Sequence, residues 1–164
     1  IECNQDGPDA GRARMQFICE LPRMVDEGNA LFVHGSPRGP TNEYVFPEDT
    51  QNVKKMEKLF SMVTKICFQG HTHVPGVFTQ DLRFVRPIDA ESGYQVGDSE
   101  QRLMINVGSV GQPRDGDPRS CYVVYDEETI HFRRVSYDIE RTVREINDEP
   151  DLDDYLGLRL REGR

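Results

Sequence analysis

The chain has 164 residues, of which 36% are hydrophobic and 30% are charged, and its formal net charge is −9. This length and balance suit one soluble globular domain with its own core, and no stretch approaches the ~20 consecutive apolar residues of a membrane span. The acidic balance argues against nucleic acid as the main partner, because such binding needs a clustered basic surface.

Four elements are predicted in the first half of the chain. Residues 8–20 form a helix, because apolar side chains recur there at helical spacing and Pro22 follows. Residues 30–33 form a strand that enters a loop rich in glycine and proline. Residues 48–63 form the best-defined helix and residues 65–69 a short buried strand. The apolar face of the second helix consists of Val53, Met56, Leu59, Phe60 and Val63.

The second half is richer in strands. Turn signals between apolar runs indicate one hairpin around residues 80–81 and another around residues 127–128. Residues 88–101 are polar and read as a surface loop. The predicted strands are residues 76–80, 82–87, 102–108, 121–126 and 129–138.

Two further helices are predicted over residues 139–147 and 151–160. Short polar side chains before a helix can accept hydrogen bonds from its first N–H groups. The predicted cap residues of the chain are Asp9, Asp49 or Thr50, Asp138 and Asp151.

This order of elements predicts an α/β or mixed layered domain around a central sheet. Residues 1–164 are interpreted as a single domain, with a helical tail over residues 138–164. Three loops each follow an apolar strand, with the sequences "HGSPRGP", "GHTH" and "GSVGQPRDGDP". Because sites in open α/β sheets form beyond the carboxyl ends of strands, these loops are the first candidates for function.

Three of the four histidines lie in these strand-end loops. Side chains at positions i and i+2 of extended backbone point to one side, so His71 and His73 could converge on one metal ion. The alternative is an exposed polar turn, and His34 after a second strand favours the metal site. His131 lies within an alternating strand and is interpreted as a surface histidine.

The four cysteines are Cys3, Cys19, Cys67 and Cys121. They stand singly, without the paired spacing of a zinc site or a disulfide framework. We therefore predict reduced, buried thiols. In the absence of a secretory signal segment, this predicts a cytoplasmic protein.

At this point three motifs show a resemblance to a known family. The stretches "FVHGSP", "GHTHVPG" and "NVGSVGQPRDGDP" resemble the later motifs of the calcineurin-like metallophosphoesterases, and most closely their small bacterial phosphodiesterase and phosphatase branch. The similarity runs over residues 31–137, with the motifs in the family's order. It implies a β-sandwich flanked by helices, with two metal ions at one edge.

The resemblance also implies a reaction. In this family a hydroxide that bridges two divalent ions attacks the phosphorus of a phosphomonoester or phosphodiester. Carried over to this chain, His34 and His71 would bind one ion and His73 the other. Manganese, iron, zinc and nickel all suit such a mixed shell, and the sequence does not choose among them.

The chain departs from the family in its first part. The family's D-x-H, G-D and G-N-H motifs supply carboxylate and asparagine ligands, and none precedes His34 here. The only Gly-Asp pairs are residues 97–98 and 116–117, and "CNQD" at residues 3–6 is at best a degenerate G-N-x-D. Since the chain begins with Ile1, we expect it to be the C-terminal part of a longer enzyme. This stretch alone is expected to bind metal weakly and to have no turnover.

Further residues in the loops are candidates for contact with a phosphate ester. A guanidinium suits bidentate contact with phosphate, and the loops also offer amide and hydroxyl groups. The candidates are Arg38, Asn42, Asn106, Ser109 and Arg114. Asp115 and Asp117 are interpreted as parts of a turn and not as metal ligands.

Two other functions stay open at this stage. One is a non-catalytic binding module of the same fold with a degenerate or absent metal site. The other is a regulatory or interaction domain in which the histidines serve structure alone. The predicted partner is a phosphate-ester substrate, with no membrane, no bulk nucleic acid, and a homo-oligomer left open.

Overall fold

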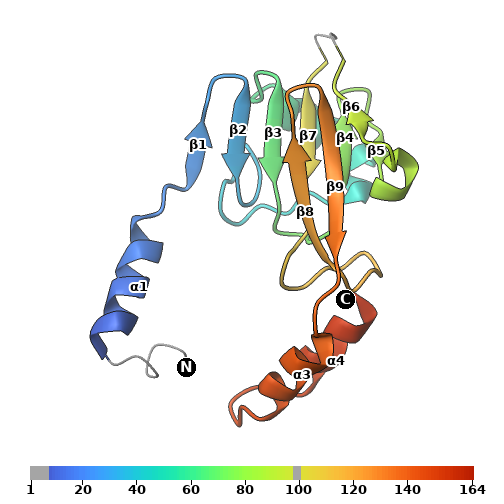
Figure 1. The fold of residues 1–164 in the computed structure, drawn as a ribbon. Coiled ribbons are helices and arrows are strands. Elements are labelled where there is room, and N and C mark those ends of the chain that lie inside the picture. The colour runs from blue at the N-terminus through green and yellow to red at the C-terminus, as the bar shows by residue number, and fades with distance from the viewer. Residues whose placement is uncertain (1–7, 98–100) are drawn as a thin grey trace.

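A computed structural model describes residues 8–97 and 101–164, and it shows two sheets with four α-helices (Figure 1). The α-helices are α1 (Pro8–Glu20), α2 (Val53–Phe60), α3 (Ile139–Asn147) and α4 (Tyr155–Glu162). Two short 3-10 helices are η2 (Pro47–Gln51) and η3 (Pro87–Ala90). The strands are β1 (Met24–Asp26), β2 (Ala30–Val33), β3 (Ile66–Gln69), β4 (Gly76–Thr79), β5 (Phe84–Val85), β6 (Tyr94–Gln95), β7 (Leu103–Asn106), β8 (Ser120–Tyr125) and β9 (Thr129–Val135).

The larger sheet has six strands in the order β1-β2-β3-β7-β4-β5. Strands β2, β3 and β7 are mutually parallel, whereas β1, β4 and β5 run antiparallel to their neighbours. All four residues of β3 are buried, as expected for a short apolar strand in the middle of a sheet. The parallel centre places the carboxyl ends of β2, β3 and β7 along one edge.

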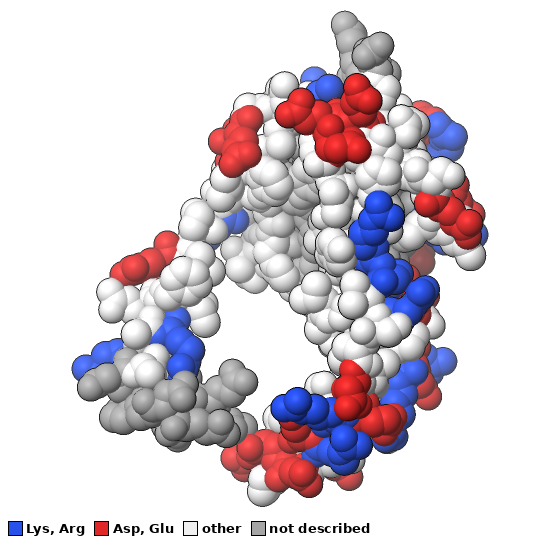
Figure 2. Space-filling model, viewed as in Figure 1, with Lys and Arg blue, Asp and Glu red and all other residues white. Residues whose placement is uncertain are grey.

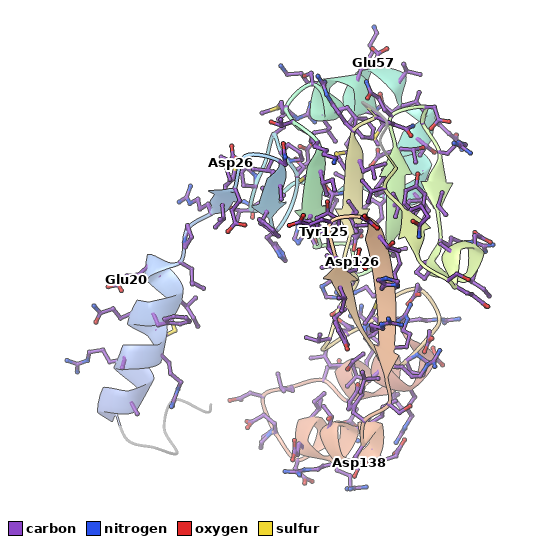
Figure 3. All side chains as sticks on the ribbon, turned by 45° about the horizontal axis from the view of Figure 1, so that its top comes forward. Glu20, Asp26, Glu57, Tyr125, Asp126 and Asp138 are labelled. Atoms are coloured by element: carbon purple, nitrogen blue, oxygen red, sulfur yellow. The ribbon has the colours of Figure 1, made fainter. Side chains whose placement is uncertain are left out.

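The smaller sheet has the order β6-β9-β8 and is antiparallel throughout. Strands β8 and β9 form the predicted hairpin, and Glu127 in its turn has a φ of 74°, the left-handed conformation that tight turns require. Tyr125 and Asp126 mark the end of β8 in Figure 3. The predicted hairpin of β4 and β5 is also present.

Two clusters of buried side chains hold three layers together. The first packs α2 against the larger sheet and includes Met56, Leu59 and Cys67. The second lies between the two sheets and includes Phe68 and Ile130. Neighbouring residues of β3 enter different clusters because successive side chains of a strand point to opposite faces. The predicted mixed α/β class is therefore confirmed.

Helix α2 starts later and ends earlier than the helix predicted over residues 48–63, because it stops at Phe60. Its cap is Asn52, whose side chain accepts a hydrogen bond from the Lys55 N–H at 3.2 Å, and not Asp49 or Thr50. The side chain of Asp49 accepts from the Phe46 N–H at 2.8 Å, at the start of η2. Residues 47–51 therefore form a 3-10 turn of their own, because two polar side chains compete to begin the helix.

The two C-terminal helices pack on each other, and Asp138 caps α3 as predicted, accepting from the Arg141 N–H at 3.0 Å (Figure 3). Helix α4 begins at Tyr155 rather than at residue 151. Asp153, and not the predicted Asp151, accepts a hydrogen bond from the Tyr155 N–H at 2.8 Å. Asp151, Asp153 and Asp154 all precede α4 and are all suitable cap residues, so the sequence alone does not show which one is used.

The N-terminal helix α1 forms over the predicted residues but lies apart from the two sheets in Figure 1. Its apolar side chains are largely exposed, with Phe17 at 65% and Ile18 at 58%. Cys19 is also exposed, which corrects the prediction of a buried thiol there, whereas Cys67 and Cys121 are buried. Residues 3–6, with Cys3, lie outside the described residues, as does the side chain of the predicted cap Asp9.

Two smaller features complete the fold. Strand β1 has three exposed residues at a sheet edge and no apolar pattern that the sequence could show. The predicted polar loop over residues 88–101 contains η3 and the short strand β6 in its described part. No helix of the described residues is long and apolar enough to span a bilayer.

Candidate metal centre

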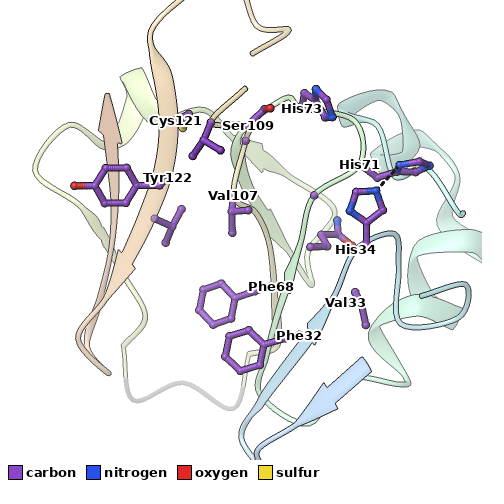
Figure 4. Close-up of a pocket in the computed structure, with 15 residues that line it drawn as sticks. Phe32, Val33, His34, Phe68, His71, His73, Val107, Ser109, Cys121 and Tyr122 are labelled. Atoms are coloured by element: carbon purple, nitrogen blue, oxygen red, sulfur yellow. Dashed lines mark hydrogen bonds between the residues drawn. The ribbon is translucent and has the colours of Figure 1, made fainter. Parts of the chain in front are cut away.

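The three loops singled out in the sequence meet at one edge of the larger sheet. His34 directly follows β2, His71 and His73 follow β3, and Ser109 follows β7. Because these strands are parallel neighbours, their carboxyl ends lie side by side. Figure 4 shows the three histidine rings and Ser109 at this edge.

His34 and His71 face each other. The His34 Nε2 and His71 Nδ1 atoms are 2.8 Å apart, and the rings meet edge to face with centroids 4.6 Å apart. Two nitrogens that bind one ion at about 2.0–2.1 Å each stand roughly 3 Å apart when the angle at the ion is near 90°. In this structure the separation is that of a hydrogen bond, in which one ring nitrogen donates its N–H to the other. The two nitrogens are close enough to bind a single ion if that proton leaves.

The surroundings of His71 keep its ring in place. Tyr44 stacks on it with ring centroids 3.8 Å apart, and Tyr44 stacks in turn on Phe46. Burial lowers the pKa of His71, and the nearby His34 lowers it further, while a hydrogen bond with the main chain of Asn42 opposes these effects. The ring is thus biased toward its neutral form, which is the form that binds metal.

His73 is held by the loop that follows β7. Its Nδ1 atom lies 2.6 Å from the main-chain oxygen of Gln112, and its own main-chain oxygen accepts from the Arg114 N–H at 3.1 Å. Burial lowers the pKa of His73, the bond to Gln112 opposes this, and the charge of Arg114 lowers the pKa further. His73 is therefore also biased toward the neutral form.

The backbone of the histidine turn differs from the extended form assumed from the sequence. His71 has a φ of 65° and His73 a φ of 61°, so both lie in the left-handed region. Such residues are strained and cluster at functional sites. The two rings consequently do not converge by strand alternation: one faces His34 and the other faces Gln112.

Asn106, predicted to contact substrate, lies fully buried beneath the histidine turn. Its amide nitrogen donates to the Gly70 main-chain oxygen at 2.8 Å and to the Thr72 Oγ1 at 2.7 Å. Its amide oxygen accepts from the Gly108 N–H at 3.0 Å. These bonds tie the "GHTH" turn to the loop after β7, so the side chain supports the site from below.

The substitution Asn106→Ala is expected to lower the free energy of unfolding by about 2–4 kcal/mol, because it leaves several buried polar groups without a partner. Urea denaturation followed by circular dichroism measures this. Asn42→Ala is the matched control, since Asn42 is exposed and a surface change of this kind stays within about 0.5 kcal/mol. Equal losses in the two variants would contradict the supporting role of Asn106.

A cleft of about 510 Å³ extends from the histidines between the larger sheet and β8. Its far wall is apolar, with the rings of Phe32 and Phe68 stacked at a centroid distance of 5.2 Å (Figure 4). Ser109 lines the cleft, and its Oγ accepts a hydrogen bond from the Gln112 N–H at 2.9 Å. Apolar walls with a few polar groups at one end are typical of ligand sites.

Arg38, predicted to contact phosphate, has a protein partner in this structure. Its guanidinium forms an ion pair with Glu43, which also accepts a hydrogen bond from the Ser36 Oγ. The hydrogen bond from Arg38 lowers the pKa of Glu43, so this carboxylate is charged at neutral pH. The ion pair engages the Nε and Nη2 atoms of Arg38, while 45% of the side chain stays exposed.

The other candidates fall into two groups. Arg114 lies close enough to His71 and His73 for its charge to lower the pKa of both, and Asn42 contacts His71 through its main chain.

The two acidic residues of the loop after β7 form ion pairs with arginines instead. Asp115 pairs with Arg134, and Asp117 pairs with Arg119 and Arg134. Hydrogen bonds from Arg119 lower the pKa of Asp117 to about 2. His131 lies in β9, 3.4 Å from the carboxylate of Asp126.

In the described part of the chain, no group of three or more His, Cys, Asp or Glu side chains is arranged to hold a metal ion. His34 and His71 form a pair, while the ring of His73 is bonded to Gln112. Neutral imidazoles carry no negative charge to balance two dications. The residues present therefore fit the imidazole part of a divalent metal site and do not by themselves complete a two-metal site.

One residue of the site was missed by the sequence reasoning. Gln112 contacts His73 through its main-chain oxygen, which every residue type possesses, so no side-chain pattern could identify it. The only signal was its place in the glycine-containing loop after β7.

Comparison with known proteins shows which family this sequence matches and which proteins are similar to it. The sequence model of the calcineurin-like phosphoesterase superfamily domain matches residues 4–129. An uncharacterized protein of Methanocaldococcus jannaschii is 32% identical over 157 residues, which are 92% of this chain and 60% of that protein.

Two solved structures share the fold. The crystal structure of a metallophosphoesterase from Sphaerobacter thermophilus superposes with a TM-score of 0.81 at 34% identity, over 93% of this chain and 62% of that one. A hypothetical protein from Pyrococcus horikoshii superposes with a TM-score of 0.68 at 17% identity, over 96% of this chain and 57% of that one, and supports the fold alone. The chain thus spans about three fifths of the length of these relatives.

Proposed function

Because this chain belongs to the calcineurin-like phosphoesterase superfamily, we propose that it serves the metal-dependent hydrolysis of a phosphomonoester or phosphodiester. The observation that carries the proposal is the facing pair of His34 and His71, 2.8 Å apart at the carboxyl ends of parallel strands. The family and the metallophosphoesterase neighbour support a hydrolase in general terms. The class of substrate, the identity of the metal and catalytic turnover are what we propose beyond that.

In this proposal His34 and His71 bind one divalent ion, and His73 binds a second. A divalent ion at such a site acts as a Lewis acid toward a phosphoryl oxygen and lowers the pKa of water. The chain's residues contribute neutral ring nitrogens, because burial lowers the pKa of His71 and of His73. Manganese, iron, zinc and nickel are the candidate ions.

The chain also offers groups that suit the rest of a phosphate ester. Arg114 supplies a positive charge near the histidines, which favours an anionic phosphate over a neutral ester. Ser109 lines the cleft, and the apolar wall of the same cleft suits the organic part of the substrate. We propose that phosphate lies at the histidine end and the ester group along the cleft.

A non-catalytic binding module is the second candidate. The observation in its favour is that the described residues hold no group of three or more potential ligands around one point. Such a module would bind phosphate or a single metal ion without turnover. One experiment therefore tests both candidates, because it measures metal binding and ester hydrolysis separately.

The test measures hydrolysis of bis(p-nitrophenyl) phosphate and p-nitrophenyl phosphate by the protein, expressed with every residue that its gene encodes. After treatment with a chelator, activity is expected to be absent and to return with manganese, zinc, iron or nickel. Hydrolysis that persists after metal removal would contradict the proposal. Stoichiometric metal binding without turnover of either ester would favour the binding module.

A further inference from the structure

Gln112 is a centre of hydrogen bonds beside the histidines. Its N–H donates to the Ser109 Oγ at 2.9 Å, and its side-chain oxygen accepts from the Arg114 guanidinium at 3.0 Å. Its main-chain oxygen lies 2.6 Å from the His73 Nδ1 atom. Every polar group of Gln112 that faces the loop is therefore engaged, which leaves this residue little freedom to move.

The bond to His73 determines which nitrogen of that ring carries the proton. A main-chain carbonyl can only accept, so the Nδ1 atom of His73 must be the donor. In a neutral imidazole the other nitrogen then has the free lone pair. The main-chain oxygen of Gln112 thus directs the lone pair of His73 to Nε2.

The far end of the chain holds Gln112 in place. The side-chain nitrogen of Gln112 donates to the main-chain oxygen of Arg164 at 3.1 Å, and the Gly116 N–H donates to the main-chain oxygen of Gly163, also at 3.1 Å. Both acceptors lie directly after α4. The end of this helix is therefore bonded to both ends of the segment 112–116.

Gly163 is required for this close approach. Its φ is 65°, and a Cβ atom at this position would lie 2.8 Å from main-chain atoms of Asp117. A larger residue there must push the end of α4 away from the loop. The contact between α4 and the loop thus depends on a residue that is remote in sequence from all three histidines.

We propose that Gln112 is a positioning residue for His73, and that the end of α4 holds Gln112 in the position that keeps the His73 Nδ1 protonated. The consequence for metal binding rests on the proposed function, because only there does the Nε2 lone pair act as a ligand. Hydrogen bonds that orient a metal-binding histidine in this way typically change metal affinity by about 10–100-fold when lost. The protonation pattern itself does not depend on that function.

The test records two-bond ¹H–¹⁵N correlations of the histidine rings in the full, metal-free chain, above neutral pH. In the unmodified protein His73 is expected to show the Nδ1–H form. Gln112→Ala removes the bonds to Arg164 and Arg114, and Gly163→Ala removes the docking of α4 and leaves the bond to Arg114. Both are expected to shift His73 toward a mixture that contains the Nε2–H form, while the signals of His131 stay unchanged.

Gly111→Ala is the matched control in the same loop, because a Cβ atom there meets nothing within 4 Å. It is expected to leave the His73 signals as they are. An Nε2–H form of His73 in the unmodified protein would overturn the inference without any variant. The inference would also be overturned if His73 kept a pure Nδ1–H form in both Gln112→Ala and Gly163→Ala. If only one of these variants folds, a pure Nδ1–H form in that one has the same meaning.

Metal titration of the same variants separates this inference from the proposed function. If both hold, zinc affinity falls by about 10–100-fold in Gln112→Ala and Gly163→Ala and stays constant in Gly111→Ala. If the signals of His73 shift but no variant, nor the unmodified protein, binds metal, the positioning role stands and the proposed function fails.

Discussion

Replacing His34 with alanine is expected to lower the affinity of the protein for a divalent ion by more than about 100-fold, and to remove hydrolysis of the diester with it. Loss of a group that merely orients a ligand already costs about 10–100-fold, so loss of the ligand itself costs more. His34 supplies the nitrogen that faces His71 at 2.8 Å, and the variant leaves His71 without this partner. Isothermal titration calorimetry of metal-free protein with manganese and zinc measures the affinity.

His131→Ala is the control for this variant. His131 is a histidine of the same chain that lies in β9, outside the strand-end loops. Its partner is the carboxylate of Asp126. Its removal is expected to leave metal affinity and turnover unchanged. Equal metal affinity in the His34 variant and the unmodified protein would remove His34 from the site.

Leu59→Ala is expected to lower the free energy of unfolding by about 2–5 kcal/mol, the range observed when a fully buried leucine is truncated. Leu59 lies on the inner face of α2, has no exposed surface, and packs in the cluster between this helix and the larger sheet. The cavity left behind would be lined by rigid strands, which relax only in part. Chemical denaturation at equilibrium measures the change.

Val53→Ala in the same helix gives the comparison. Val53 belongs to the apolar face predicted from the sequence, yet 47% of it is exposed. Its truncation is expected to change stability by no more than about 0.5 kcal/mol. A similar loss in both variants would show that α2 packs on the sheet differently from the structure described above.

The contrast between Leu59 and Val53 shows which buried residues helical spacing can predict and which it cannot. Helical spacing correctly grouped Met56, Leu59 and Phe60 as buried, because residues three and four apart share one face of a helix. Val63 is also buried, but it lies beyond the end of α2 at Phe60, so helical spacing is not the reason. The spacing also included Val53, which stands in the first turn, where η2 and the cap at Asn52 redirect the chain. Caps depend on which of several polar side chains reaches an N–H first, and spacing alone does not decide this.

The same division applies to the site. By itself the sequence placed His34 after one strand and His71 and His73 after another, because apolar runs identify strands and polar residues directly after them must lie at their ends. That the two strands are neighbours is a result of the structure. Its motifs also indicated the superfamily that the family match then showed.

Only the tertiary structure decided what each side chain contacts. The contact of His34 with His71, the bond of His73 to Gln112, and the bond of Asn106 to Gly70 all join residues far apart in the chain. The link from α4 through Gln112 to His73 runs partly through main-chain atoms. Since main-chain groups are the same in every residue, their partners are set by the path of the folded chain and leave no mark in the order of the side chains.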